Sequence, residues 1–225
     1  MKPYYDHAGI TIYHGDCREI LPAMEPASID LVLTDPPYGI GADRNLRANK
    51  QHGHAAAMSR DYGCGGWDAA PPDAATMGRV VSAAPLAIVW GGNYFCLPPS
   101  SGWLVWDKDN GKNGYADCEL AWTNLRQAVR RMRYRWMGML QERAGREKEE
   151  RVHPTQKPLP VMLWCMGFAP DAATVLDPFM GSGTTLRAAK DLGRRAIGIE
   201  IEERYCEIAA KRMGQEVLFP AGETP

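Results

Sequence analysis

The sequence predicts an α/β protein with a mostly parallel sheet and helices on both of its faces. Two observations predict this class. Short apolar or β-branched runs, which are typical of strands, alternate with stretches of helical periodicity. Two of these runs end directly in unusual turns, as strands of an open α/β sheet do at their ligand-binding edge. A chain of 225 residues is long enough for one sizeable core, and we expect residues 1–225 to form a single domain.

Eight runs have the length and composition of strands: 10–13, 29–34, 86–90, 103–106, 119–122, 133–139, 174–177 and 196–200. Five stretches between or after them are expected to be helices: 17–24, 76–83, 159–167, 184–192 and 202–213. Strands that alternate with helices predict parallel neighbours and a sheet covered on both faces. Residues 40–72 and 141–151 do not follow this rhythm, and long irregular segments in compact domains are usually functional.

Composition excludes several classes of protein. The six cysteines are scattered without a Cys-x-x-Cys pair, so we expect reduced thiols and neither a disulfide framework nor a metal site. We find no apolar run of membrane-spanning length and no signal-peptide pattern, which predicts a cytoplasmic protein that does not enter a membrane.

One unusual turn, Gly181-Ser182-Gly183-Thr184, follows the expected strand 174–177 and begins a helix. Its glycines allow close backbone approach, and the free amides of a helix start can bind an anionic group. Leu186 stands where the dinucleotide fingerprint requires a third glycine. Asp177 would repel a pyrophosphate but suits an ammonium group, and Glu200 can bind ribose hydroxyls. These features favour S-adenosylmethionine over a dinucleotide.

The other unusual turn, Asp35-Pro36-Pro37-Tyr38, follows the expected strand 29–34 and should lie at the same sheet edge. Consecutive prolines stiffen it, because each fixes its own φ and restricts the preceding residue. The turn can direct the Asp35 carboxylate and the Pro36 carbonyl at the two hydrogens of one exocyclic amine, while Tyr38 stacks on the base. Two such acceptors localise the lone pair of a nucleobase amine toward a methyl donor, and a base inside a duplex must first flip out.

The formal net charge is −1, but basic residues are concentrated in two places, which indicates contact with phosphates. One cluster lies within residues 44–60. The other holds five arginines within ten residues, interleaved with Tyr134 and Trp136: Arg126, Arg130, Arg131, Arg133 and Arg135.

These motifs, in this order, resemble the permuted β group of DNA amino-methyltransferases, which act on adenine N6 or cytosine N4. The family's catalytic motif is Asp/Asn/Ser-Pro-Pro-Tyr/Phe, and its cofactor motif is similar to the segment from Asp177 to Thr184. His153-Pro154-Thr155-Gln156-Lys157-Pro158 resembles the segment that helps to bind the methionine end of the cofactor. Gly15-Asp16-Cys17 resembles the turn whose aspartate contacts the cofactor's adenine. The resemblance covers about residues 9–214.

The resemblance implies a Rossmann-like methyltransferase fold with a mostly parallel seven-stranded sheet that includes one antiparallel strand. It implies S-adenosyl-L-methionine as the cofactor, double-stranded DNA as the substrate and a possible homodimer. Recognition loops are expected at about 40–70 and 110–151, and residues 90–94 and 106–108 either line the base pocket or pack at strand ends. A restriction–modification system, a solitary enzyme and a phage enzyme all stay open.

The resemblance assigns roles residue by residue. The implied catalytic residues are Asp35, Pro36, Pro37 and Tyr38. The implied cofactor-binding residues are Asp16, Cys17, Asp35, His153, Thr155, Gln156, Lys157, Asp177, Phe179, Gly181, Ser182, Gly183, Thr184, Glu200 and Ile201. The implied DNA-binding residues are Arg44, Arg47, Lys50, Arg130, Arg131 and Arg133.

Adenine N6 is the favoured target, because the family's adenine enzymes more often carry aspartate at the position of Asp35 and its cytosine N4 enzymes more often carry serine. Cytosine N4 is the first alternative. An RNA or protein amide methyltransferase is less favoured, because those enzymes usually carry asparagine there and place the cofactor motif first. A DNA-binding regulator without turnover is disfavoured by the presence of Asp35, Tyr38, Lys157 and Asp177.

Overall fold

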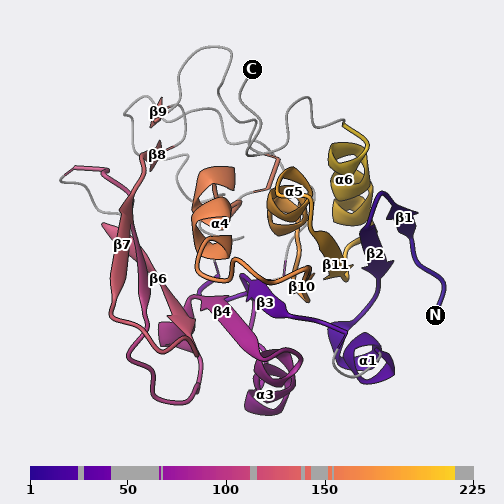
Figure 1. Cartoon of the computed structure of the whole chain (residues 1–225), viewed down its shortest axis with the longest axis horizontal. Helices are drawn as coiled ribbons and strands as arrows, with labels where there is room; N and C mark the ends of the chain where they lie inside the picture. Colours follow the sequence, from indigo (N-terminus) through magenta and orange to yellow (C-terminus); the bar gives the residue numbers. More distant parts are fainter. Residues whose placement is uncertain are drawn as a thin grey trace.

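A nine-stranded sheet forms the centre of the computed structural model (Figure 1). The structure describes residues 1–24, 28–41, 66, 68–111, 116–137, 140–142, 152–153 and 155–215. The strand order is β1-β2-β11-β10-β3-β4-β6-β5-β7. The strands are β1 (Tyr5–His7), β2 (Ile10–His14), β3 (Leu31–Thr34), β4 (Leu86–Trp90), β5 (Leu104–Asp107), β6 (Cys118–Thr123), β7 (Arg130–Arg133), β10 (Thr174–Asp177) and β11 (Arg195–Glu200). A second sheet pairs β8 (Trp136–Met137) with β9 (Leu140–Gln141).

The expected number of seven strands was wrong, although the sheet contains the seven-stranded arrangement. Strands β2-β11-β10-β3-β4-β6-β5 are parallel in direction except β6, which is antiparallel to both of its neighbours. Strand β1 adds a second antiparallel strand at one edge, and β7 pairs parallel to β5 at the other. Both additions are short and largely polar, which an edge strand tolerates because it pairs on one side only.

Seven of the eight expected strands are confirmed within two residues of their ends. The eighth, at 133–139, is divided rather than continuous: Arg133 ends β7, which pairs with β5, and Trp136–Met137 form β8 outside the main sheet. The five expected helices are confirmed. They are α1 (Cys17–Ile20) with its 3₁₀ continuation η1 (Leu21–Ala23), α3 (Ala74–Ser82), α4 (Leu159–Met166), α5 (Thr184–Asp191) and α6 (Glu203–Met213); a further 3₁₀ turn, η3 (Gly92–Tyr94), follows β4.

Helices α4, α5 and α6 cover one face of the sheet, and α1 and α3 cover the other (Figure 1). Side chains alternate between these faces along each strand. In β3, Leu31 and Leu33 pack toward α4–α6, whereas Val32 packs toward α1 and α3. The central strands therefore read as continuous apolar runs, as expected for a sheet buried on both sides. No helix in the described part of the chain has the length and apolarity that a membrane span needs.

The strand directions gather the ends of five strands at one edge. Asp16 follows β2, Asp35 follows β3, and Trp90 ends β4. Asp177 ends β10 and Glu200 ends β11. Neighbouring strands are in register at this edge, with Asp177 beside Gly198 and Glu200 beside His14. The two sequence motifs therefore meet at one edge, which we call the carboxyl edge.

The turn before β10 is tied to the turn before β3 at the opposite edge. Asp30 Oδ2 accepts hydrogen bonds from the amides of Ala173 at 2.9 Å and Thr174 at 2.8 Å. We expect Asp30→Ala to lower the free energy of unfolding by about 1–3 kcal/mol, because two amides lose their acceptor. Urea denaturation measures this change, with the exposed Glu19→Ala as a control expected to change by under about 0.5 kcal/mol. Equal midpoints for both variants would contradict the role of Asp30.

Candidate active site

Asp35 is held from two sides. The Tyr38 hydroxyl donates to Asp35 Oδ1 at 2.6 Å, and Lys157 Nζ donates to Asp35 Oδ2 at 2.5 Å. Lys157 Nζ also lies 3.2 Å from the Tyr38 oxygen. The side chain of Lys157 is only 5% exposed. Three residues from two expected motifs thus form one cluster, and Lys157 contacts the catalytic turn rather than the cofactor turn.

The ring of Tyr38 has close neighbours. Tyr94 stacks on it with ring centroids 4.8 Å apart and an interplanar angle of 13°. Gly91 has a φ of +67°, and a Cβ there would lie 2.1 Å from the Tyr38 ring, so only glycine fits. Tyr94 is 47% exposed. A base can therefore stack on the Tyr38 face that Tyr94 covers only after Tyr94 moves, a requirement that the sequence did not indicate.

The residue that fixes the end of the catalytic turn was missed by the sequence analysis. Asp68 is buried, and its Oδ1 accepts the Gly39 amide at 2.7 Å. Its backbone carbonyl accepts the Gly41 amide at 3.2 Å. Asp68 lies in a stretch without periodicity, so no sequence pattern distinguished it from its neighbours.

The cofactor turn adopts the conformation that its glycines predicted. Gly181 and Gly183 have φ values of +50° and +77°. The Gly183 amide donates to Met180 O at 2.9 Å. From α6, Arg212 Nη1 donates to the Ser182 carbonyl at 2.7 Å and lies 3.2 Å from its hydroxyl. Arg212 therefore fixes the turn, and it too was missed because its reach depends on how α6 packs.

Asp177 is engaged within the protein. Its Oδ1 accepts the Thr34 hydroxyl at 2.7 Å and the Phe179 amide at 3.1 Å, and the residue is 2% exposed. Glu200 accepts the Gly181 amide through Oε2 and the Glu202 amide through Oε1, both at 2.9 Å. Both carboxylates therefore order the backbone on which a cofactor would rest.

The two carboxyl groups beside the cofactor turn, Asp177 and Glu200, resist ionisation. Burial raises the pKa of Glu200 to about 7, with a smaller contribution from Asp177. Burial likewise raises the pKa of Asp177 to about 6, although hydrogen bonds from Thr185 and Thr34 oppose the shift. Neighbouring carboxylates that repel one another favour a ligand with positive charge. This donor set fits S-adenosylmethionine, which carries a sulfonium and an ammonium group together with ribose hydroxyls.

The remaining implied cofactor residues are split between the edge and the interior. The His153 ring packs against the Tyr205 ring with their centroids 4.4 Å apart. It also borders the cofactor turn, since a Cβ added at Gly181 would lie 3.8 Å from the His153 ring. Asp16 caps α1 through the Arg18 amide at 2.8 Å and is ion-paired with Arg18. Ile201 is 59% exposed.

Other implied residues make internal contacts. The Thr155 hydroxyl lies 3.2 Å from His153 Nδ1. Gln156 is buried and accepts the Val152 amide at 2.9 Å. Cys17 is buried, which raises the pKa of its thiol to about 11.

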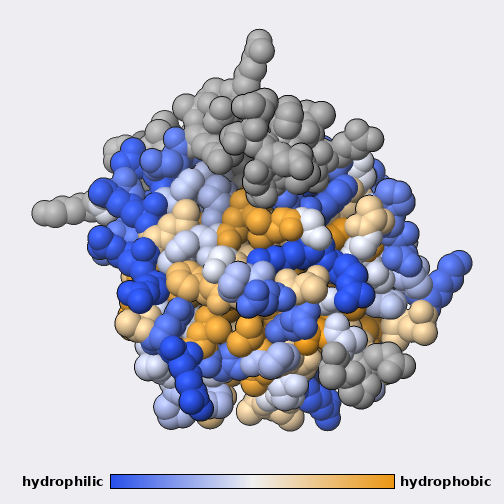
Figure 2. All heavy atoms as spheres, in the orientation of Figure 1, coloured by the Kyte–Doolittle hydropathy of each residue, from blue (hydrophilic) through white to orange (hydrophobic). Residues whose placement is uncertain are grey.

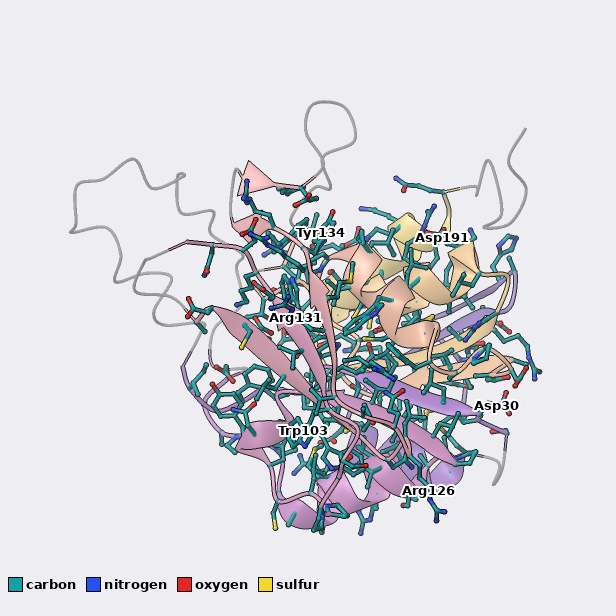
Figure 3. The ribbon with its side chains drawn as sticks, turned by 60° about the vertical axis from the view of Figure 1, so that its left-hand side comes forward. Asp30, Trp103, Arg126, Arg131, Tyr134 and Asp191 are labelled. Carbon is teal, nitrogen blue, oxygen red and sulfur yellow. The ribbon has the colours of Figure 1, made fainter. Side chains whose placement is uncertain are left out.

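The described part of the expected DNA surface is the β7 edge. Arg130, Arg131 and Arg133 are exposed, and hydrophilic side chains gather over this edge in Figure 2. Arg131 lies 3.7 Å from Asp107, and Arg133 is ion-paired with Asp109. Figure 3 shows Arg126 at the opposite end of this part of the sheet from Arg131.

Some expected residues lie outside the part of the chain that the structure describes: Arg44, Arg47, Lys50, Pro154 and most of 40–70 and 143–151. Within the described ranges, no three His, Cys, Asp or Glu side chains come together as a metal ion would require.

Comparisons with known proteins place this geometry in context. A family model described as DNA methylase, labelled for N6 and N4 methyltransferases, matches residues 89–211. Type II methyltransferase M2.DpnII of Streptococcus pneumoniae is 27% identical over an alignment of 261 positions, which spans 96% of this chain and 93% of the relative. Type II methyltransferase M.ScaI of Streptomyces caespitosus is 26% identical over an alignment of 276 positions, which spans 96% of this chain and 84% of the relative.

Two solved structures share the fold. M1.HpyAVI in complex with SAM superposes with a TM-score of 0.56 at 24% identity, covering 92% of this chain and 100% of that chain. The PvuII DNA methyltransferase, described as cytosine-N4-specific, superposes with a TM-score of 0.60 at 13% identity, covering 97% of this chain and 91% of that chain. These likenesses confirm the expected methyltransferase fold.

We expect S-adenosylmethionine to bind about tenfold or more tightly at pH 7.5 than at pH 5.5. The reason is that Asp177 and Glu200, with pKa values raised to about 6 and 7, lose protons over this range and then attract the cationic ligand. Isothermal titration calorimetry in two buffers of different ionisation enthalpy measures both the affinity and the proton release. Glu200→Gln should remove the higher of the two transitions. A pH-independent affinity without proton release would contradict this role of the carboxylates.

Proposed function

Because the chain belongs to the DNA methylase family, we propose that it methylates the exocyclic N6 of an adenine flipped out of duplex DNA at a specific sequence. Membership confirms the resemblance to DNA amino-methyltransferases and S-adenosyl-L-methionine as the cofactor. The observation that carries the proposal is the Asp35 carboxylate, held between Tyr38 and Lys157 beside the cofactor turn.

The chain's own residues account for the activation of the amine. Asp35 and the Pro36 carbonyl accept hydrogen bonds from its two N–H groups, so its lone pair is localised on nitrogen. S-adenosyl-L-methionine, when bound, supplies an electrophilic methyl group and leaves as a neutral thioether. The nitrogen carries an extra proton once its new bond has formed, and Asp35 accepts that proton. Burial raises the pKa of Asp35 more than Lys157 lowers it, which suits a carboxylate that must accept a proton.

Adenine is proposed over cytosine on the identity of Asp35, because serine is more frequent there in cytosine N4 enzymes. The matching family covers both targets. The relatives named Type II methyltransferases support a role in a restriction–modification system. Duplex DNA as substrate, a homodimer and a cytoplasmic location are parts of the same proposal.

We expect Asp35→Ala and the isosteric Asp35→Asn to lower the methylation rate by about 10²–10⁴-fold, because both remove the proton acceptor. Mass spectrometry of nucleosides from DNA methylated in vitro measures the product and identifies the base. Binding of S-adenosylmethionine and of DNA should be largely retained, which separates lost chemistry from lost folding. Near-normal turnover in either variant would contradict the mechanism, and a product containing only N4-methylcytosine would overturn the adenine target.

We expect Arg131→Ala and Arg133→Ala each to weaken DNA binding and to reduce the slope of log K against log salt by about 1, as loss of one phosphate contact does. Fluorescence anisotropy across a salt series measures the slope. The matched control is Arg126→Ala, which is also exposed but lies at the opposite end of this part of the sheet (Figure 3). Slopes that equal those of the control would place the DNA-binding face elsewhere.

A further inference from the structure

Four charged side chains form a line of alternating sign that begins at the catalytic carboxylate. Lys157 Nζ lies 2.5 Å from Asp35 and 3.0 Å from Glu119 Oε2. Lys108 Nζ lies 2.6 Å from the other oxygen, Glu119 Oε1. Glu119 thus binds both ammonium groups, one with each oxygen, and it was not among the expected site residues. We call these four residues the charge line.

Strand alternation explains why the charge line forms. Asp35 lies two residues after Leu33 of β3, and Glu119 lies two residues before Ala121 of β6. Alternate residues of a strand share a face, and Leu33 and Ala121 both belong to the core on the α4 side. Glu119 also lies opposite Trp106 in the pairing of β5 with β6. Since Lys157 stands two residues before the start of α4, its side chain meets the carboxylates on the face that this helix covers.

The surroundings of Lys157 leave it few other partners. The aromatic rings of Trp90 and Tyr38 lie 5.7 and 5.5 Å from its Nζ. Cys165 of α4 is fully buried, and burial raises the pKa of its thiol far above the usual range, so it stays neutral. Among the residues that the structure describes, the charged groups that face Lys157 are Asp35 and Glu119.

We propose that Glu119 is a positioning residue, which holds Lys157 on Asp35 so that the catalytic carboxylate presents one fixed oxygen to the substrate amine. This inference rests on the proposed function. Lys157 engages Asp35 Oδ2 and the Tyr38 hydroxyl donates to Oδ1, so the second lone pair of Oδ1 is the one that accepts a hydrogen bond from the amine. When the proton of the amine passes to Asp35, Lys157 loses a charged partner there. Glu119 then retains the ammonium group in place until the proton leaves to solvent.

The ionisation of the charge line supports this division of roles. Burial opposes the charge on Glu119, but Lys157 and Lys108 outweigh it and lower the pKa of Glu119 to about 2. Burial also opposes the charge on Lys157, but Asp35 and Glu119 outweigh it and raise the pKa of Lys157. Asp35 is the member whose pKa is raised toward proton uptake, and Glu119 contributes to that rise.

The test compares Glu119→Gln with Lys157→Met by single-turnover methylation across pH, with DNA and cofactor saturating. Removing the negative charge of Glu119 should move the acid limb of the pH–rate profile to lower pH by roughly one unit. Removing the positive charge of Lys157 should move it to higher pH. The plateau rate of Glu119→Gln should fall about 10–100-fold, with the affinities for cofactor and DNA within about threefold of the wild type.

Opposite shifts in the two variants distinguish positioning from a structural role, which would lower both rates without moving the limb. Glu207→Gln breaks an exposed pair, Lys211–Glu207 at 2.7 Å, and is the matched control with an unchanged profile. Thermal unfolding reports folding. If Glu119→Gln does not fold, Glu119→Asp serves instead and should keep the wild-type limb with a reduced plateau.

The failures are distinguishable. A wild-type protein that methylates no DNA would overturn the proposed function. The role of Glu119 alone would be overturned if the wild type methylates DNA and the pH–rate profile of Glu119→Gln superimposes on the wild-type profile. The same would follow if Glu119→Asp has the plateau rate of the wild type.

Discussion

The hydrogen bond between Thr34 and Asp177 joins the two halves of the active site. Thr34 is the last residue of β3 and Asp177 the last of β10, and these strands are parallel neighbours. The Thr34 hydroxyl donates to Asp177 Oδ1 at 2.7 Å, and both residues are buried. The catalytic turn begins one residue after Thr34, and the cofactor turn follows Asp177 within four residues. Transfer between two bound molecules requires a fixed separation, and this contact lets neither turn move without the other.

The carboxyl edge concentrates opposite charges in an interior where an isolated charge is costly. The two parts of this edge lower that cost in different ways. In the charge line, two carboxylates and two ammonium groups balance one another within the protein. Beside the cofactor turn, Asp177 and Glu200 have hydroxyl and amide donors but no ion pair with another described residue, and their pKa values are raised. The second part suits a cationic ligand, and in the first the charge of the catalytic carboxylate is balanced by Lys157.

Sequence patterns predicted the central sheet because its strands are apolar on both faces, whereas the edge strands β1 and β7 carry polar residues and were missed or misplaced. Asp35, Asp177 and Glu200 could be placed at one edge because each ends or follows a parallel strand. Glu119 could not, because it stands near the start of β6, and an antiparallel strand brings its beginning to that edge. The contact of Lys157 with Asp35 depends on how α4 docks, which no local pattern contains.

The strand order also dictates when the site can assemble during synthesis. Strands β2 and β3 come early in the chain but are not neighbours; β10 and β11, from the last third of the chain, fill the space between them. The N-terminal part alone therefore has two strands without their partners, and closing the sheet requires contacts across long sequence separations, which are slow to form. A nascent chain consequently has no methylating centre until the ribosome has released residues through β11. The catalytic turn leaves the exit tunnel long before the strands that carry the cofactor site have followed it.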